Sequence, residues 1–211
     1  PGCVTPTEIM AAMKLGLRVV KFFPANVYGG LTAMKSLSGP FGGIRFIPTG
    51  GVGPKNLIDY LSCPNVFAVG GSWMVPSDAV KAGDWGRIET LCHEARLLSL
   101  GFSLLHVGIN PQCECCALDE ARMFAAMLGM PFKEGNSSAF VGKSFEFMKA
   151  QGRGEKGHIA IETLSVERAL EWFSCFGIGV VEETIKRKDG HITVAYLDRE
   201  VAGFAVHLNR K

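Results

Sequence analysis

The chain has 211 residues, which is enough for one large domain or two small ones. Its residues are 47% hydrophobic and 20% charged, a composition that predicts a packed globular protein and excludes extensive disorder. The formal net charge of +2 argues against nucleic-acid or membrane partners. The sequence shows no signal peptide and no apolar run near the roughly 18 residues of a membrane span.

The seven cysteines are an odd number, and their spacing does not suggest a disulfide framework. Cys113, Cys115 and Cys116 form a cluster for which a zinc or redox site is one alternative. Reduced thiols are the plainer interpretation, and we therefore expect a cytoplasmic protein.

The first half alternates short apolar strands with amphipathic helices. Thr5, Pro6 and Glu8 predict a capped helix start, and this helix ends near Gly16. Further helices are predicted over 29–37, 54–61 and 84–98, and strands over 17–23, 44–48 and 66–69. This order implies a parallel α/β sheet.

Lys21 lies in the apolar strand 17–23, which we expect to be buried on both faces. A lysine that forms a Schiff base must lose its proton near neutral pH, and apolar surroundings favour the neutral amine. The alternative is a lysine whose stem packs on the strand while its ammonium group stays in water.

Two glycine-rich turns follow the last two predicted strands. They are Thr49-Gly50-Gly51 and Gly70-Gly71-Ser72. Glycine lets the backbone approach an anion, and exposed N–H groups can hold it. A single turn of this kind would indicate only a tight bend, but two at successive strand ends favour a phosphate site.

The segment Lys21-Phe22-Phe23-Pro24-Ala25, together with these turns, resembles the 2-keto-3-deoxy-6-phosphogluconate and 4-hydroxy-2-oxoglutarate aldolases over about residues 1–99. The resemblance implies a domain over 1–99 that forms the last three strands of a partial TIM (β/α) barrel. It implies a class I aldolase with Lys21 as the catalytic residue and no cofactor. It also implies contacts to substrate and phosphate from Phe23, Pro24, Thr49, Gly50, Gly51, Gly71 and Ser72.

The implied reaction cleaves a small 2-keto acid to pyruvate and either glyceraldehyde 3-phosphate or glyoxylate. In this family an earlier strand supplies the general base, so we expect a longer natural protein, a trimer, and little activity from this chain alone. Glu8 reads as a helix cap rather than as a substitute base.

The second half contains an internal repeat that begins after Gly101. Strand 104–109 leads into helix 118–128, and strand 157–161 leads into helix 166–176. Further strands are predicted over 139–141, 144–148, 180–186, 191–197 and 203–208. Each half of the repeat therefore reads as a βα unit followed by a meander of strands.

The first and last strands of each repeat carry one polar residue in an apolar context. These residues are His106, Glu146, His158 and His207. A single strand histidine is usually a core or surface residue, but four symmetric positions favour a divalent metal such as Zn, Fe, Ni or Mn.

The paired βαβββ pattern resembles the vicinal-oxygen-chelate fold of glyoxalases over residues 103–211. The resemblance implies an α+β metal-binding domain, with His207 standing where glyoxalases usually have Glu. A metal-dependent lyase or isomerase, a regulatory module that binds a small ligand, and an oligomerisation module all remain open. A tight loop at 133–138 predicts a small pocket.

Overall fold

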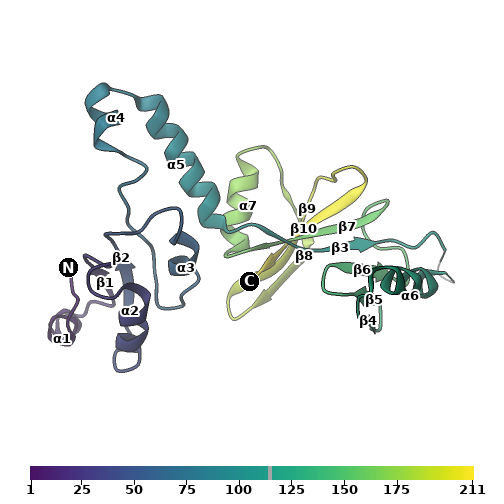
Figure 1. The fold of residues 1–211 in the computed structure, drawn as a ribbon, viewed down its shortest axis with the longest axis horizontal. Helices are drawn as coiled ribbons and strands as arrows, with labels where there is room; N and C mark the ends of the chain where they lie inside the picture. The colour runs from purple at the N-terminus through teal and green to yellow at the C-terminus, as the bar shows by residue number, and fades with distance from the viewer. Residues whose placement is uncertain (114–115) are drawn as a thin grey trace. The chain divides into compact units, whose positions relative to one another are not determined.

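The computed structural model describes residues 1–113 and 116–211 and has a mixed α/β fold (Figure 1). The chain divides into two compact units, Pro1–Ser99 and Leu100–Lys211. Among the described residues, no helix is both long enough and apolar enough to cross a bilayer.

The first helix, α1 (Pro6–Lys14), begins with the predicted capping box. The Thr5 hydroxyl accepts a hydrogen bond from the Glu8 N–H, and the Glu8 carboxylate accepts from the Val4 and Thr5 N–H groups at 2.9 Å each. These backbone hydrogen bonds hold the pKa of Glu8 below its usual value. The predicted role of Glu8 as a helix cap is confirmed.

The sheet of the first unit consists of β1 (Val19–Phe22) and β2 (Arg45–Pro48), which pair in parallel. The predicted third strand over 66–69 is not a full strand. It is reduced to one parallel bridge between Phe46 and Val66, and a second bridge joins Thr49 to Gly70 just after it. The remaining helices are α2 (Gly30–Ser38), α3 (Leu57–Leu61), α4 (Ser77–Ala82) and α5 (Trp85–Leu100), of which α4 was not predicted.

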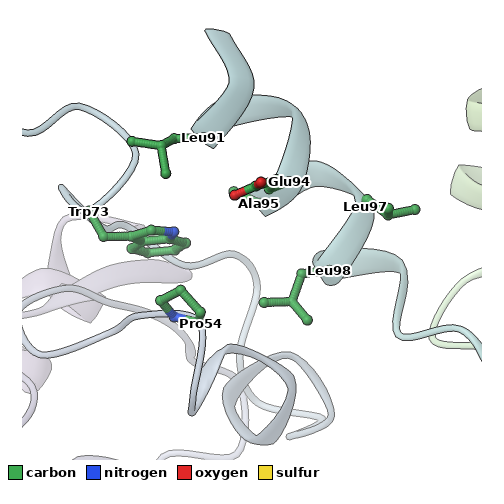
Figure 2. A pocket seen from close by; sticks show the side chains of 7 residues that line it. All are labelled: Pro54, Trp73, Leu91, Glu94, Ala95, Leu97 and Leu98. Carbon is green, nitrogen blue, oxygen red and sulfur yellow. The ribbon is translucent and has the colours of Figure 1, made fainter. Parts of the chain in front are cut away.

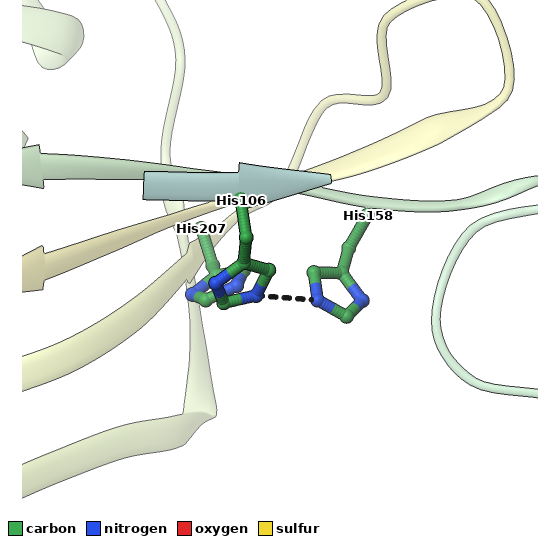
Figure 3. Close-up of side chains that lie close together, drawn as sticks. All are labelled: His106, His158 and His207. Atoms are coloured by element: carbon green, nitrogen blue, oxygen red, sulfur yellow. Dashed lines mark hydrogen bonds between the residues drawn. The ribbon is translucent and has the colours of Figure 1, made fainter. Parts of the chain in front are cut away.

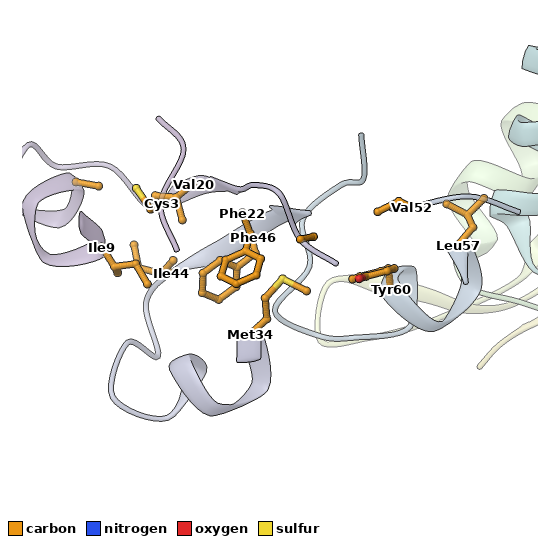
Figure 4. Packing of buried hydrophobic residues seen from close by; sticks show 12 residues of the cluster. Cys3, Ile9, Val20, Phe22, Met34, Ile44, Phe46, Val52, Leu57 and Tyr60 are labelled. Atoms are coloured by element: carbon orange, nitrogen blue, oxygen red, sulfur yellow. The ribbon is translucent and has the colours of Figure 1, made fainter. Parts of the chain in front are cut away.

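The core of the first unit lies on one face of this short sheet, against α1 and α2 (Figure 4). Phe22 and Phe46 are fully buried there, with ring centroids 5.8 Å apart in an edge-to-face arrangement. Lys21 lies on the other face and is exposed. The prediction of a strand buried on both faces is therefore wrong, because successive side chains of a strand point to opposite faces and only one face is covered here.

The second unit is one eight-stranded sheet with the order β4-β5-β6-β3-β7-β10-β9-β8. Its first module contains β3 (Ser103–Ile109), α6 (Ala117–Leu128), β4 (Phe132–Glu134), β5 (Ser138–Val141) and β6 (Phe145–Met148). Its second module contains β7 (Gly157–Thr163), α7 (Val166–Ser174), β8 (Val180–Lys188), β9 (His191–Leu197) and β10 (Phe204–Arg210). The predicted repeat is confirmed. The strand β4 was missed, and two of its three residues fall in the loop predicted over 133–138.

Each module pairs its first strand with its last in parallel, and the two modules meet through the antiparallel pair β3–β7. Alternate residues of β6 and β10 pack on the helices, including Phe147 with α6 and Leu208 with α7. Glu146 directly precedes Phe147, and His207 directly precedes Leu208. Both therefore point to the opposite face of the sheet.

The sulfur atoms of Cys113 and Cys116 are joined in a disulfide, just before α6. The expectation of reduced thiols is therefore wrong for this pair. Cys115 lies outside the described residues. Cys3, Cys63, Cys92 and Cys175 are free thiols.

Thr163 is fully buried, and its hydroxyl donates a 2.7 Å hydrogen bond to the Leu100 carbonyl. The same carbonyl also accepts from the Leu164 N–H at 3.0 Å, so it keeps one partner when the hydroxyl is removed. We expect Thr163→Val to lower the free energy of unfolding of the second unit by about 1 kcal/mol. Urea denaturation of the full chain measures this. The more exposed Thr193→Val is the control, and an equal loss in both variants would contradict the prediction.

Candidate functional site

The first candidate site lies at the ends of β1 and β2. A cavity of about 350 Å³ is lined by Phe23, Thr49, Gly50, Gly51, Val52, Gly71 and Ser72. These include six of the seven residues predicted to contact substrate or phosphate. The seventh, Pro24, lies beside the cavity, since a side chain on Gly50 would meet Pro24 at 3.2 Å.

Lys21 reaches this region from β1. Its Nζ lies 4.7 Å from the centroid of the Phe23 ring, which itself lines the cavity. The amine therefore lies next to the aromatic wall of the cavity, on the open face of the sheet.

The glycines of the turns make close backbone approach possible. A side chain on Gly51 would meet the Asn26 side chain, and one on Gly70 would meet the Thr49 hydroxyl at 2.6 Å. The Asn56 amide braces the first turn, because it accepts from the Gly53 N–H and donates to the Gly51 carbonyl, each at 2.9 Å. The sequence alone did not indicate this role of Asn56.

A second cavity of the first unit, of about 360 Å³, lies under α5 (Figure 2). Leu91, Ala95 and Leu98 of the helix face Trp73 and Pro54 across it. Its lining is almost wholly apolar and includes none of the predicted site residues, so it adds no chemistry to the candidate site.

The second candidate site is a cluster of side chains on the open face of the eight-stranded sheet. His106, His158 and His207 come from β3, β7 and β10, and one ring nitrogen from each lies within 4.8 Å of the others (Figure 3). The Nε2 atoms of His106 and His158 are 3.0 Å apart. The Glu146 carboxylate of β6 lies 3.1 Å from His106 Nε2 and 3.2 Å from His158 Nε2. The structure thus brings all four predicted ligands together.

Small residues between the ligands make this convergence possible. Gly108 pairs with Glu146 on one side and with His158 on the other, and a side chain at Gly108 would collide with the His158 ring. Ala160 lies between His106 and His207 in the same way. Neither small residue was identified from the sequence, although both lie two residues from a predicted ligand.

The electrostatics of the cluster follow from its burial and its crowding. Hydrogen bonds from His106 and His158 hold the pKa of the Glu146 carboxyl well below its usual range, and the Ser138 hydroxyl donates to the same group at 2.6 Å. Burial, with the neighbouring His158 and His106, lowers the pKa of His207 to about 4. Within the described residues, neither buried ring nitrogen of His207 makes a hydrogen bond of good geometry, although the Asn209 side chain lies near the ring.

The cluster opens into a cavity of about 530 Å³. Besides the four ligand residues, its lining is Met148, Arg153, Glu183, Thr184, Lys186, Val194, Tyr196 and Asn209. The Tyr196 ring stacks on His207 with centroids 4.6 Å apart. None of residues 133–138 lines this cavity, and Ser138, in β5, contacts the cluster through its hydrogen bond to Glu146.

Comparison with known proteins gives a family match within the first unit. Residues 1–91 match the family model described as KDPG and KHG aldolase. The chain is 53% identical over 95 residues to the 2-dehydro-3-deoxy-phosphogluconate aldolase of Dickeya dadantii, and this alignment covers 45% of each chain. The chain therefore spans less than half the length of the curated relatives it matches.

Two solved structures are among the matches. The KDPG aldolase of Legionella pneumophila, with pyruvate captured as a covalent carbinolamine intermediate, is 43% identical and has a TM-score of 0.44. That match covers 45% of this chain and 46% of the other. A methylmalonyl-CoA epimerase in complex with methylmalonyl-CoA and NH4+ is 17% identical, with a TM-score of 0.36 over 52% of this chain and 96% of the other.

Gly108 provides a direct test of how the second cluster is packed. We expect Gly108→Ala to lower the free energy of unfolding by about 1–3 kcal/mol, because the added methyl group must displace the His158 ring. Urea denaturation measures the loss. Gly86→Ala in α5 is the control, because a side chain there meets open space and alanine favours the helix. A Gly108→Ala variant as stable as the control would contradict this packing.

Proposed function

We propose that the first unit carries the Schiff-base lysine and the phosphate site of a class I aldolase. The observation that supports this most directly is the match of residues 1–91 to the KDPG and KHG aldolase family. The cavity beside Lys21 supports it as well, since the aromatic ring that lines the cavity lies against the Lys21 amine.

In the proposed reaction the Lys21 amine attacks the C2 ketone of a 2-keto acid, and water leaves to form an iminium ion. The iminium accepts the electron pair of the C3–C4 bond as that bond breaks. The products are pyruvate and glyceraldehyde 3-phosphate from 2-keto-3-deoxy-6-phosphogluconate, or pyruvate and glyoxylate from 4-hydroxy-2-oxoglutarate. Bond cleavage leaves an enamine on Lys21, a proton must add to its C3 to restore the iminium, and hydrolysis of that iminium then releases pyruvate and frees Lys21. No cofactor takes part in these steps.

The glycine turns are the proposed phosphate site. Gly51, Gly71 and Ser72 line the cavity, and among the described residues their N–H groups make no backbone hydrogen bond. N–H groups without a backbone partner can donate hydrogen bonds to an oxyanion. Glycine, which lacks a side chain, lets the anion come close to them. Phe23 and Pro24 would form the wall near the imine.

Cleavage also needs a base that removes the C4 hydroxyl proton. No carboxylate lines the cavity in the described part of the chain, and Glu8 is engaged as a helix cap. We therefore propose that this chain alone forms the imine but cleaves substrate poorly. The complete site, and the proposed cytoplasmic trimer, would need the parts of an aldolase that lie outside the matched residues.

Borohydride reduction in the presence of pyruvate tests the lysine. We expect the full chain to gain one reduced pyruvate at Lys21, because only an imine is trapped in this way. Peptide mass spectrometry locates the adduct. Lys21→Arg should lose the label and Lys35→Arg, on the exposed side of α2, should keep it. Labelling at another lysine, or no label at all, would contradict the proposal.

We further propose that the second unit is a vicinal-oxygen-chelate domain that holds a divalent metal at His106, Glu146, His158 and His207. Tetrahedral zinc ligands at about 2.0 Å from the ion lie about 3.3 Å from one another. The three contacts among His106, Glu146 and His158 are 3.0 to 3.2 Å, close to that spacing. The donor set therefore fits a metal ion.

Hydrogen bonding alone does not satisfy this cluster. The Nε2 of a neutral imidazole carries at most one proton, so His106 cannot donate to Glu146 and to His158 at once. His207 buries two ring nitrogens that make no hydrogen bond of good geometry among the described residues. Such groups are costly unless something binds them, and a metal ion is what three imidazoles and a carboxylate bind well.

When bound, a divalent ion would act as a Lewis acid that polarises oxygen atoms of a ligand. The chain's own groups orient the site. Ser138 holds the Glu146 carboxylate, and Tyr196 stacks on His207 and fixes its ring. A metal-dependent lyase or isomerase, or a regulatory module that binds a small ligand, would both use this arrangement.

Metal content tests this second proposal. We expect one Zn²⁺ or Ni²⁺ per chain after metal loading and dialysis, measured by inductively coupled plasma mass spectrometry. His106→Ala should weaken metal binding at least tenfold, because it removes one ligand. His191→Ala is the matched control, since His191 lies in the same unit with a side chain 59% exposed. A wild-type chain that retains no metal would contradict the proposal, as would two variants that bind it equally.

A further inference from the structure

The cavity above the His-Glu cluster has charged side chains that the ligand set does not use. Arg153, Glu183 and Lys186 line it together with the four ligands. Arg153 is ion-paired with Glu183 at 3.1 Å, and its guanidinium lies 5.5 Å from the Tyr196 ring centroid. No ion pair engages the Lys186 ammonium within residues 1–113 and 116–211.

The position of Arg153 relative to the cluster follows from a chain of ring contacts. Arg153 lies over Tyr196, and Tyr196 stacks on His207 with centroids 4.6 Å apart. Arg153 and the cluster therefore share one neighbour, the Tyr196 ring, and line the same cavity. A small molecule could contact both within the cavity of about 530 Å³.

The charges in the cavity predict the charge of its ligand. Arg153 and Lys186 balance the carboxylates of Glu146 and Glu183, so the side chains alone are neutral when the histidines are neutral. A divalent ion would leave two positive charges at this site, where Arg153, Glu183 and Lys186 lie at the exposed rim of the cavity. A dianion would balance them, and an uncharged or singly charged ligand would not.

We propose that this cavity binds a small 2-oxo or 2-hydroxy dicarboxylate. Its oxygen pair at one end would face the His-Glu cluster, and its distal carboxylate would face Lys186 and Arg153. This inference rests on the proposed metal site and adds the ligand class to it. Lys186 provides the unpaired charge, and the planar Arg153 fork can bind a carboxylate beside its bond to Glu183.

Isothermal titration calorimetry of the metal-loaded full chain carrying Lys21→Arg tests this, with 2-oxoglutarate and pyruvate as probes, because this variant cannot form an imine with either 2-oxo acid. The two share the 2-oxo acid group, but only 2-oxoglutarate has a distal carboxylate. We expect 2-oxoglutarate to bind at least about tenfold more tightly, the size of one charge-assisted hydrogen bond. Lys186→Gln should remove most of this difference and leave the affinity for pyruvate unchanged.

Lys188→Gln is the matched control, because Lys188 is exposed on the same strand and does not line the cavity. Metal content of each variant is measured separately. A chain that binds no metal contradicts the proposed metal site. A metal-loaded chain that binds both probes equally, or whose preference survives Lys186→Gln, overturns the dicarboxylate inference while the metal site stands.

Discussion

The antiparallel pairing of β3 with β7 is the constraint on which the second unit depends. It joins the two βαβββ modules into one sheet and sets which residues lie opposite one another. Because the side-chain period of a strand is two, a slip of one residue would move His106 or His158 to the helix-covered face. The correct register brings Gly108 against His158, and this glycine leaves the space that the imidazole fills.

The same alternation of side-chain direction along a strand determines which groups the first unit presents outside its core. Phe22 and Phe46 point into the core, so Lys21 must point away from it. That face of the sheet is open at Lys21 in the described chain. The unit therefore presents its amine and its glycine turns with the aromatic wall of Phe23 but without a carboxylate from the described residues.

Much of this could be predicted from sequence, because its signals are local. The capping box at Thr5 and the αL glycine after α6 mark helix ends, and the histidines stand out in apolar strands. Other features depend on partners far along the chain. The exposure of Lys21 depends on which elements cover the sheet. The space that Gly108 leaves for the His158 ring depends on its cross-strand neighbours. The short β4 has three residues and too little periodicity to be recognised.

The two cavities would hold anions through different electrostatic interactions. The first is lined by uncharged groups and backbone, so an anion there would be held by N–H dipoles at short range. The second is lined by full charges from Arg153 and Lys186 beside the ligand cluster, and such charges act over several ångströms and are screened by salt. One of the proposed aldolase substrates, 4-hydroxy-2-oxoglutarate, is itself a 2-oxo dicarboxylate. Both units could therefore select the same chemical class, the first through an imine and the second through charge balance.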